Sequence, residues 1–185
     1  MSNPYAHEHI EPYLTAAQIN ERVPKLAAEM SETLEPHEPT VFICVLNGSF
    51  MFYADLLKHI TAPTNTAFLA VSSYEGGTTS SGAVRLTLDL TIDITDRHVI
   101  IVEDIVDTGL TMSYLLENLR ARKPKSLRVC SLLHKPAREK IKVPIDFCGF
   151  VIDDVFVVGY GLDYDQRYRD LPFIGVMSFD EESPA

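Results

Sequence analysis

The chain has 185 residues, a length typical of a single domain that buries an adequate core without disulfides or structural metals. Hydrophobic residues make up 46% of the chain, which excludes an intrinsically disordered protein. Lys and Arg number 16 and Asp and Glu 26, so the net charge is −10. This argues against a protein that binds nucleic acid or a membrane surface, because both need basic area to neutralise phosphates.

The N-terminal half opens with a polar stretch. Residues 1–14 predict a poorly ordered tail, which is too polar for a signal peptide. Thr15 and Gln18 fit a capping box. Apolar residues at helical spacing then run to Leu34, with Pro24 expected to kink the helix or restart it. The next segments predict a buried strand at Val41–Leu46, a helix at Phe50–Ile60 and a strand at Thr66–Ser72.

The second half alternates strands with helices. Residues 74–82 have almost no apolar content, and the run His98–Val102 is the strongest buried-strand signal. We further expect a strand at Ala83–Asp89, a helix at Met112–Arg122, and strands at Leu127–Leu133, Phe147–Ile152, Val155–Val158 and Phe173–Ser178. This alternation predicts an α/β fold with a mostly parallel, twisted sheet flanked by helices. Ligands of such folds bind beyond the carboxyl ends of the strands.

The segment after His98–Val102 carries the strongest chemical signal. Residues 103–111 read EDIVDTGLT and lead into a helix, whose N-terminal N–H groups and dipole favour an anion. Thr108 and Thr111 add hydroxyl donors, and Gly109 lets the backbone approach a ligand closely. We therefore expect a phosphate at the second half of this segment.

The first half of the segment is acidic. Glu103, Asp104 and Asp107 would repel a phosphate, but carboxylates accept hydrogen bonds from vicinal hydroxyls and hold hydrated Mg²⁺. Carboxylates followed by phosphate donors suit a ribose 5-phosphate. The alternative interpretation is an acidic loop that only caps a helix, with Asp107 or Thr108 as the N-cap residue.

The string EDIVDTGLT resembles the 5-phosphoribosyl diphosphate (PRPP) motif of the type I phosphoribosyltransferases. Four further segments resemble the hypoxanthine-guanine members of that family, the bacterial hypoxanthine type most closely. They are LNGSFMFYADLL (46–57, first active-site loop), SSYEGGTTSSG (72–82, lid), SLLHKPAR (131–138) and VFVVGYGLDYDQRYRDLPFIG (155–175), the last two contacting purine. The resemblance runs in unbroken order from about residue 15 to residue 180.

The resemblance implies one phosphoribosyltransferase domain over residues 1–185. This domain would have a small hood built from the N- and C-terminal segments and a mobile lid at residues 74–82. It also implies a reaction in which a purine base and PRPP give a nucleoside monophosphate and pyrophosphate. Mg²⁺ is the implied cofactor. A Gly-, Thr- and Ser-rich lid cannot bury itself, so it should move when empty and exclude water when closed.

The resemblance also assigns roles at the sugar and phosphate groups. Asp107 is implied as the general base at the imidazole nitrogen of the purine, while Glu103 and Asp104 hold the ribose hydroxyls directly or through Mg²⁺-bound water. The implied ribose-phosphate site comprises Glu103, Asp104, Asp107, Thr108, Gly109, Leu110 and Thr111. The implied pyrophosphate site comprises Leu46, Asn47, Gly48, Ser73, Tyr74 and Arg169.

At the purine, Lys135 matches the residue that donates to the 6-oxo group, and Phe156 should stack on the base. The implied purine site comprises Ile105, Lys135, Phe156, Val157 and Asp163, and the implied magnesium ligands are Glu103, Asp104 and Asp163. A lysine donor accepts hypoxanthine and guanine. It rejects adenine, because a 6-amino group would leave the buried donor unpaired.

One departure from the family pattern lies in the first loop. The family often has Lys or Arg where this chain has Asn47, so a positive charge near the pyrophosphate is lost. The Leu46–Asn47 peptide bond matches a non-proline cis bond of the family and is expected to be cis. Arg138 and Arg167 match no assigned role and are expected to face solvent.

Two alternatives stay open. Guanine or xanthine could be preferred over hypoxanthine, because discrimination at purine position 2 depends on the placement of backbone carbonyls. A non-catalytic PRPP- or nucleotide-sensing regulator on the same fold is the second, although such regulators usually need a basic surface or an added domain. The family further implies a homodimer or homotetramer. Three cysteines without metal or redox spacing indicate free thiols in the cytoplasm.

Overall fold

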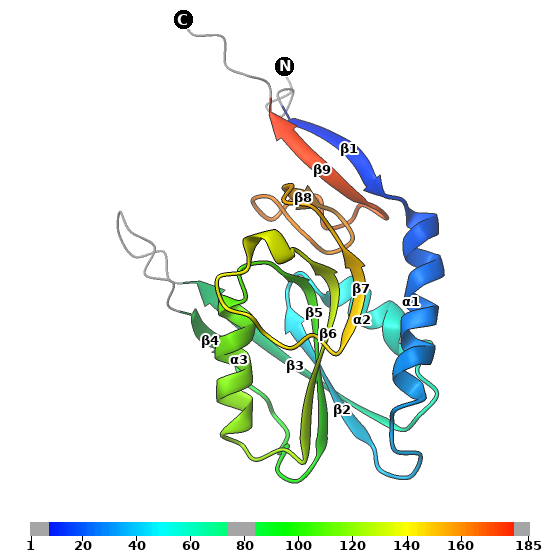
Figure 1. The fold of residues 1–185 in the computed structure, drawn as a ribbon, viewed down its shortest axis with the longest axis vertical. Coiled ribbons are helices and arrows are strands. Elements are labelled where there is room, and N and C mark those ends of the chain that lie inside the picture. Colours follow the sequence, from blue (N-terminus) through cyan, green and yellow to red (C-terminus); the bar gives the residue numbers. More distant parts are fainter. Residues whose placement is uncertain (1–7, 74–83, 180–185) are drawn as a thin grey trace, which may run out of the picture.

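The computed structural model describes residues 8–73 and 84–179. Its larger sheet has six strands in the order β4-β3-β2-β5-β6-β7 (Figure 1). All neighbours are parallel except β3 and β4, which confirms the predicted mostly parallel sheet. The strands are β2 (Thr40–Leu46), β3 (Thr64–Ser73), β4 (Val84–Leu88), β5 (His98–Val106), β6 (Ser126–His134) and β7 (Phe147–Val151).

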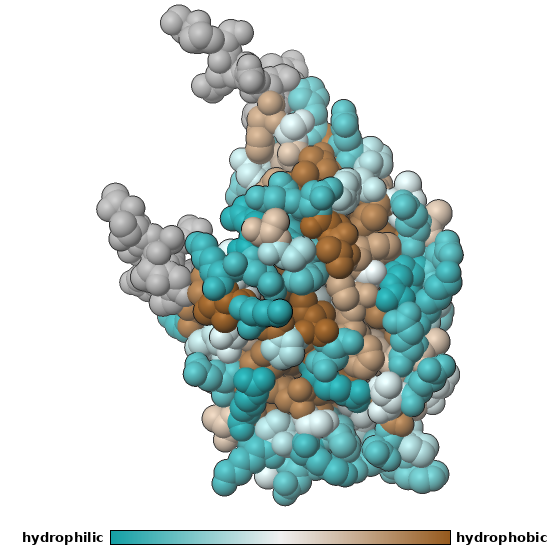
Figure 2. Space-filling view, in the orientation of Figure 1, coloured by the Kyte–Doolittle hydropathy of each residue, from teal (hydrophilic) through white to brown (hydrophobic). Residues whose placement is uncertain are grey.

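Helices cover both faces of this sheet, with α1 (Ala16–Ser31) and α2 (Phe50–Leu57) on one side and α3 (Leu110–Arg120) on the other (Figure 1). Alternate residues of β2 point to opposite faces of the sheet and pack in different core clusters. Phe42 belongs to the core cluster beneath α1 and α2, and Ile43 to the cluster beneath α3. A strand buried on both faces must be apolar throughout, which is why its sequence shows no alternation. The outer face of α1 is largely hydrophilic (Figure 2).

A second, antiparallel sheet has three strands in the order β1-β9-β8 (Figure 1). Its strands are β1 (Glu8–Leu14), β8 (Val157–Val158) and β9 (Ile174–Phe179). It lies beyond the carboxyl ends of the large sheet and joins segments from both ends of the chain. A short 3₁₀ turn, η1 (Pro136–Arg138), follows β6 on the same side of the molecule.

Strand β1 corrects one expectation from the sequence. Residues 8–14 were predicted as part of a polar tail, yet they pair with β9 from Glu8 opposite Phe179 to Leu14 opposite Ile174. Only part of the strand is shielded, so its sequence has a weak apolar pattern. Its backbone partners lie 160 to 171 residues away in the chain, and a local sequence pattern cannot reveal such pairing.

Several element boundaries also differ from the prediction. The capping box at Thr15 is confirmed, and the helix continues through Pro24 without a restart and ends at Ser31. Strand β5 extends to Val106, because β6 pairs with it as far as that residue. The expected lid at residues 74–82 lies outside the described residues. Across 8–73 and 84–179, no helix has both the length and the apolar character to cross a membrane.

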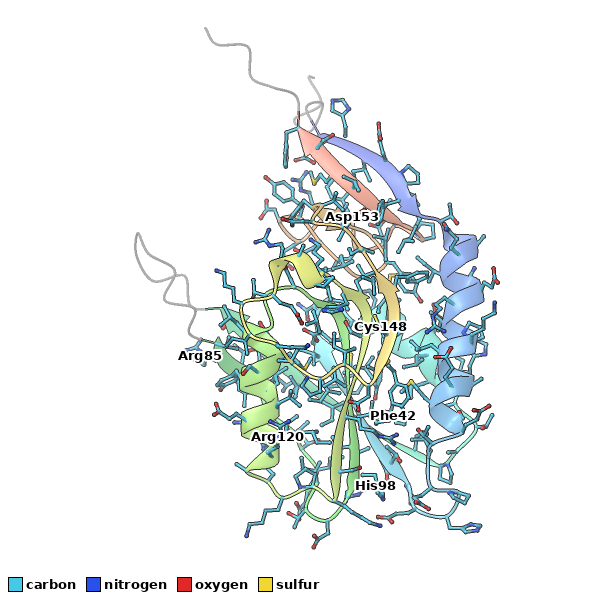
Figure 3. The ribbon with its side chains drawn as sticks, viewed as in Figure 1. Phe42, Arg85, His98, Arg120, Cys148 and Asp153 are labelled. Carbon is cyan, nitrogen blue, oxygen red and sulfur yellow. The ribbon has the colours of Figure 1, made fainter. Side chains whose placement is uncertain are left out.

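The central position of β2 generates a stability prediction. Phe42 is fully buried (Figure 3), whereas Phe68 on β3 is 46% exposed. Phe42→Ala should lower the free energy of unfolding by about 3–5 kcal/mol, through lost apolar burial and the cavity left behind. The matched Phe68→Ala should cost about 1 kcal/mol, chiefly its edge-on contact with Tyr53. Chemical denaturation measures both values, and equal losses would contradict the assigned core.

Candidate active site

A cavity of about 450 Å³ opens at the carboxyl ends of β2, β5 and β6, on the side of the small sheet. It lies where ligands of parallel sheets bind. Apolar surface also gathers between the two sheets, amid a mostly hydrophilic exterior (Figure 2). The cavity is lined by Asn47, Gly48, Asp104, Ile105, Asp107, Lys135, Arg138, Asp154, Val155, Phe156, Val157, Leu162, Asp163 and Arg169.

Glu103 and Asp104 stand at the end of β5 rather than in the loop that follows it. Sheet pairing fixes them, because Glu103 is opposite Ser131 of β6. Asp104 also lies against the loop after β2. A Cβ added to Gly48 would come within 1.6 Å of its Oδ2 atom, so only glycine fits there. The first active-site loop and the carboxylate end of β5 are therefore in direct contact.

Burial governs the charge of these two carboxyl groups. Glu103 is 8% exposed and its Oε2 has no hydrogen-bond partner among the described residues. Burial, reinforced by the neighbouring Asp104, raises the pKa of Glu103 well above its usual value. Burial also raises the pKa of Asp104 to about 6, against the opposing effects of the Ile105 N–H at 2.8 Å and the nearby Arg169.

Two adjacent, incompletely compensated carboxylates fit a divalent cation, which would relieve their charge. Within the described ranges no group of three or more His, Cys, Asp or Glu side chains could hold a metal by itself. This also fits Mg²⁺, because that ion is usually held by one or two carboxylates, with substrate phosphates and water completing its shell. The buried Glu103 oxygen without a partner is the observation that supports a cation here.

The segment after β5 forms a second cavity of about 280 Å³ at the N-terminus of α3. Gly109 is the N-cap residue, with a left-handed φ of +79° and no side-chain cap. Gly109 thus takes the N-cap position that the alternative gave to Asp107 or Thr108, although the Thr108 hydroxyl accepts a long hydrogen bond from the Leu110 N–H at 3.4 Å. The remaining N–H groups of the first turn can face an anion. The cavity is lined by Glu103, Asp104, Ile105, Val106, Asp107, Thr108, Gly109, Thr111 and Met112.

Lys135 and Phe156 line the other end of the main cavity. Lys135 directly follows β6, and its N–H donates to the Val106 carbonyl of β5 at 2.9 Å, which fixes its position. The residue is only 5% exposed, although it carries an amino group. Phe156 is 50% exposed, with its ring edge-on to Tyr164 at 5.9 Å. A buried donor and an open aromatic face are the elements needed to bind a flat heterocycle.

Arg169 and Asp163 form an ion pair at the rim of the cavity. The Nη2 atom of Arg169 is 2.8 Å from Oδ1 of Asp163, and its Nη1 donates to the Gly161 carbonyl at 2.8 Å. Asp104, Asp163 and Arg169 line the same cavity. The charge of Arg169 lowers the pKa of the Asp104 carboxyl, and the charge of Asp163 raises it.

Arg138 was expected to face solvent, and the structure corrects this. Its Nε lies 3.2 Å from Oδ1 of Asp107, and its Nη1 lies 3.5 Å from Oδ1 of Asp154. The side chain remains 47% exposed, so it bridges two carboxylates at the cavity mouth. The 3₁₀ turn at Pro136–Arg138 brings the side chain to the cavity, and no local sequence pattern had indicated this turn.

Most of the predicted site residues lie together at these two cavities. Leu110 begins α3 and lines neither of them. The Leu46–Asn47 peptide bond is cis, as expected from the sequence. Ser73 is the last residue of β3, and Tyr74 lies outside the described residues. Arg138, Asp154, Val155 and Leu162 line the cavity although no role had been assigned to them.

Comparisons with known proteins agree with this geometry. A family profile described as "Phosphoribosyl transferase domain" matches residues 9–165. A hypoxanthine-guanine phosphoribosyltransferase of Mycobacterium avium is 50% identical over 89% of this chain and 83% of its own. A hypoxanthine-guanine-xanthine phosphoribosyltransferase of Tritrichomonas foetus is 48% identical over 86% of each chain. The crystal structure of a hypoxanthine-guanine phosphoribosyltransferase from Bacillus anthracis superposes with a TM-score of 0.85 at 41% identity, covering 91% of this chain and 99% of its own.

The buried carboxylates generate a pH-dependent stability prediction. Because the pKa of Asp104 rises from 3.8 to about 6 on folding, the folded state binds this proton more tightly, so the free energy of unfolding falls as the pH rises between these values. Without ligand or metal, Asp104→Asn should raise the free energy of unfolding by on the order of 2 kcal/mol near pH 7, and it should change this free energy little near pH 4. Thermal unfolding in EDTA measures both.

The exposed Asp153 provides the control (Figure 3), because its replacement by Asn removes a carboxylate that is not buried. Asp153→Asn should show no comparable gain near pH 7. Equal gains for Asp104→Asn at both pH values would mean that its buried charge does not limit stability.

Proposed function

The chain belongs to the phosphoribosyl transferase family, and we propose that it transfers the 5-phosphoribosyl group from PRPP to hypoxanthine and guanine. The products are the purine nucleoside monophosphate and pyrophosphate. One observation carries the proposal. Asp104, next to the buried Glu103, lines both the cavity at the N-terminus of α3 and the cavity that contains the buried Lys135, so the carboxylates connect the two. A ribose phosphate and a 6-oxopurine need these groups in that order.

The phosphate end of the substrate fits the cavity at α3. The backbone N–H groups of the helix N-terminus would hold the 5-phosphate, together with the hydroxyls of Thr108 and Thr111. Glu103 and Asp104 would accept hydrogen bonds from the ribose hydroxyls. This places carbon 1 of the ribose toward the main cavity, which shares Asp104, Ile105 and Asp107 with the smaller one.

We propose Mg²⁺ as the metal, with Glu103, Asp104 and Asp163 as the residues that would hold it directly or through water. When bound, the ion would neutralise charge on the pyrophosphate as that group departs. Arg169 is placed to bind pyrophosphate oxygens, and its planar guanidinium suits two of them at once. Asn47 lines the same cavity without a charge, so more of the phosphate binding would rest on Arg169.

Asp107 is placed to act as the general base. It lies where the two cavities meet, beside the expected purine, and would accept the proton from one imidazole nitrogen of the base while the other nitrogen bonds to carbon 1. The ion pair with Arg138 would keep its carboxylate at the cavity mouth in the empty protein. When a purine binds, Arg138 must either move away from Asp107 or keep its contact with one carboxylate oxygen while the other faces the purine.

Lys135 is the proposed determinant of the base. Its amino group would donate to the 6-oxo group, Phe156 and Ile105 would cover the two faces of the ring, and Val157 would offer backbone groups to its edge. Adenine would leave Lys135 facing a second donor, at a cost of about 1–3 kcal/mol. The Tritrichomonas foetus relative includes xanthine in its name, so xanthine remains the second candidate substrate.

We also propose that residues 1–185 act as one domain that assembles as a homodimer or homotetramer in the cytoplasm. The support for this assembly is the family itself. Light scattering on the purified protein measures the number of copies.

A spectrophotometric assay tests the function directly. With PRPP and Mg²⁺, hypoxanthine and guanine should turn over at least about tenfold faster than adenine, and EDTA should abolish turnover. Lys135→Ala should lower kcat/KM for both 6-oxopurines together, whereas Lys140→Ala, an exposed lysine on the same segment, should not. PRPP binding without turnover of any base would favour the sensor alternative.

Asp107→Ala tests the general base. We expect kcat to fall about 100-fold, while the affinity for PRPP changes much less, because the proton is lost only in the chemical step. Asp154→Ala is the matched control, because Asp154 also pairs with Arg138 but has no proposed part in the proton transfer. Its kcat should fall much less. Full turnover by Asp107→Ala, with chemistry rate-limiting, would refute the assignment.

A further inference from the structure

The loop that carries Asp163 and Arg169 has a backbone shape that its sequence does not favour. Tyr164 and Arg167 exchange two backbone hydrogen bonds, of 3.2 and 3.0 Å, which close a two-residue turn. Asp165 and Gln166 within the turn have φ angles of +48° and +63°, and Tyr168 after it has +72°. None of these residues is a glycine, so contacts must offset the cost of the left-handed conformation. One contact is local, because the Gln166 N–H donates to Oδ2 of Asp163 at 2.8 Å, and others come from β1.

Glu8 of β1 supplies those contacts. Its carboxylate accepts hydrogen bonds from Nη1 of Arg167 at 2.8 Å and from Nη2 at 2.7 Å, and a further one from the Tyr168 hydroxyl. Its side chain is only 4% exposed. A buried, two-point arginine–carboxylate pair fixes both distance and orientation, which an exposed pair does not. The two residues are 159 positions apart in the chain.

Arg167 transmits this contact to the turn. Its guanidinium carbon lies 5.4 Å from the ring centre of Tyr164 and 5.1 Å from that of Tyr168. Both distances suit a cation above an aromatic face. The guanidinium therefore contacts residues on both sides of the turn while Glu8 holds it from β1.

Arg169 depends on the shape of the same loop. Its carbonyl accepts from the Gly161 N–H at 2.9 Å, and its Nη1 donates back to the Gly161 carbonyl at 2.8 Å. Its Nη2 pairs with Asp163. A shift of the turn at residues 164–167 would displace both charged side chains that the loop presents to the cavity.

We propose that Glu8 is a positioning residue for the pyrophosphate side of the site, acting through Arg167 on Arg169 and Asp163. This inference rests on the proposed function, which assigns Arg169 to pyrophosphate. Lys135 and Ile105 lie on or next to the large sheet, outside this loop. Phe156 touches the loop only through the edge-on contact of its ring with Tyr164, at 5.9 Å between ring centres, whereas Arg169 is part of the loop. Loosening the loop should therefore raise KM for PRPP more than KM for hypoxanthine.

Steady-state kinetics of Glu8→Gln test the proposal. We expect KM for PRPP and the inhibition constant of pyrophosphate to rise about tenfold, because the amide loses the ionic two-point contact, while KM for hypoxanthine changes less than about twofold. Glu29→Gln is the matched control. Glu29 accepts from both Nη atoms of Arg22 at 2.6 and 3.2 Å, but on α1 and away from the loop. Its constants should equal those of the wild type.

A double-mutant cycle separates positioning from a general loss of structure. In an Arg169→Ala background, Glu8→Gln should raise KM for PRPP by a smaller factor than in the wild type, because the part of its effect that passes through Arg169 is already lost. Fully multiplicative effects, equal rises in both KM values, or unchanged constants would each overturn the proposal. If circular dichroism shows that Glu8→Gln does not fold, Arg167→Lys takes its place. This variant keeps the positive charge but loses the two-point contact of the guanidinium with the carboxylate.

The wild type keeps the two proposals distinguishable. If the wild type transfers no phosphoribosyl group to any purine, the proposed function fails. If the wild type is active and the variants show no split between the substrates, only the role of Glu8 fails.

Discussion

Glu103 and Asp104 sit side by side at the end of β5, the strand flanked by β2 and β6 inside the large sheet. Water reaches Glu103 poorly, and the negative charge of Asp104 further disfavours the charged form of Glu103. A fold gains nothing in stability from such a pair, so the surrounding residues must be arranged to tolerate it. Gly48 leaves room for Asp104, and Arg169 brings a positive charge near it from the far side of the cavity. The positions of Gly48 and Arg169 thus follow from the need to accommodate two poorly solvated carboxylates at the end of β5.

The division of labour between the two sheets follows the same logic. The large sheet fixes Glu103 and Asp104 within β5 and Lys135 directly after β6, whereas Arg138 and Arg169 reach the cavity from a 3₁₀ turn and a loop. Acidic groups that must stay close together need the precision of paired strands. The two arginines can reach the cavity from short irregular segments because their side chains are long.

The sequence predicted the larger sheet well, because every buried strand and amphipathic helix there has a local pattern. It also placed the PRPP motif, whose residues are consecutive and span one strand end, a turn and a helix start. It missed β1, which exists only through its pairing with β9, and the pairings of Arg138 and Arg167. A lone arginine has no local signature, and its partners became visible only when strands distant in the sequence were brought together.

The pairing of β1 with β9 also sets an order on biosynthesis. Strand β1 is made before the other described strands, yet its partner β9 follows 160 residues or more later in the chain. The large sheet, complete at Val151, can assemble before β9 leaves the ribosome. Until β9 emerges, residues 8–14 have no partner strand. A nascent chain can therefore form the core of its large sheet before the small sheet that adjoins the pocket.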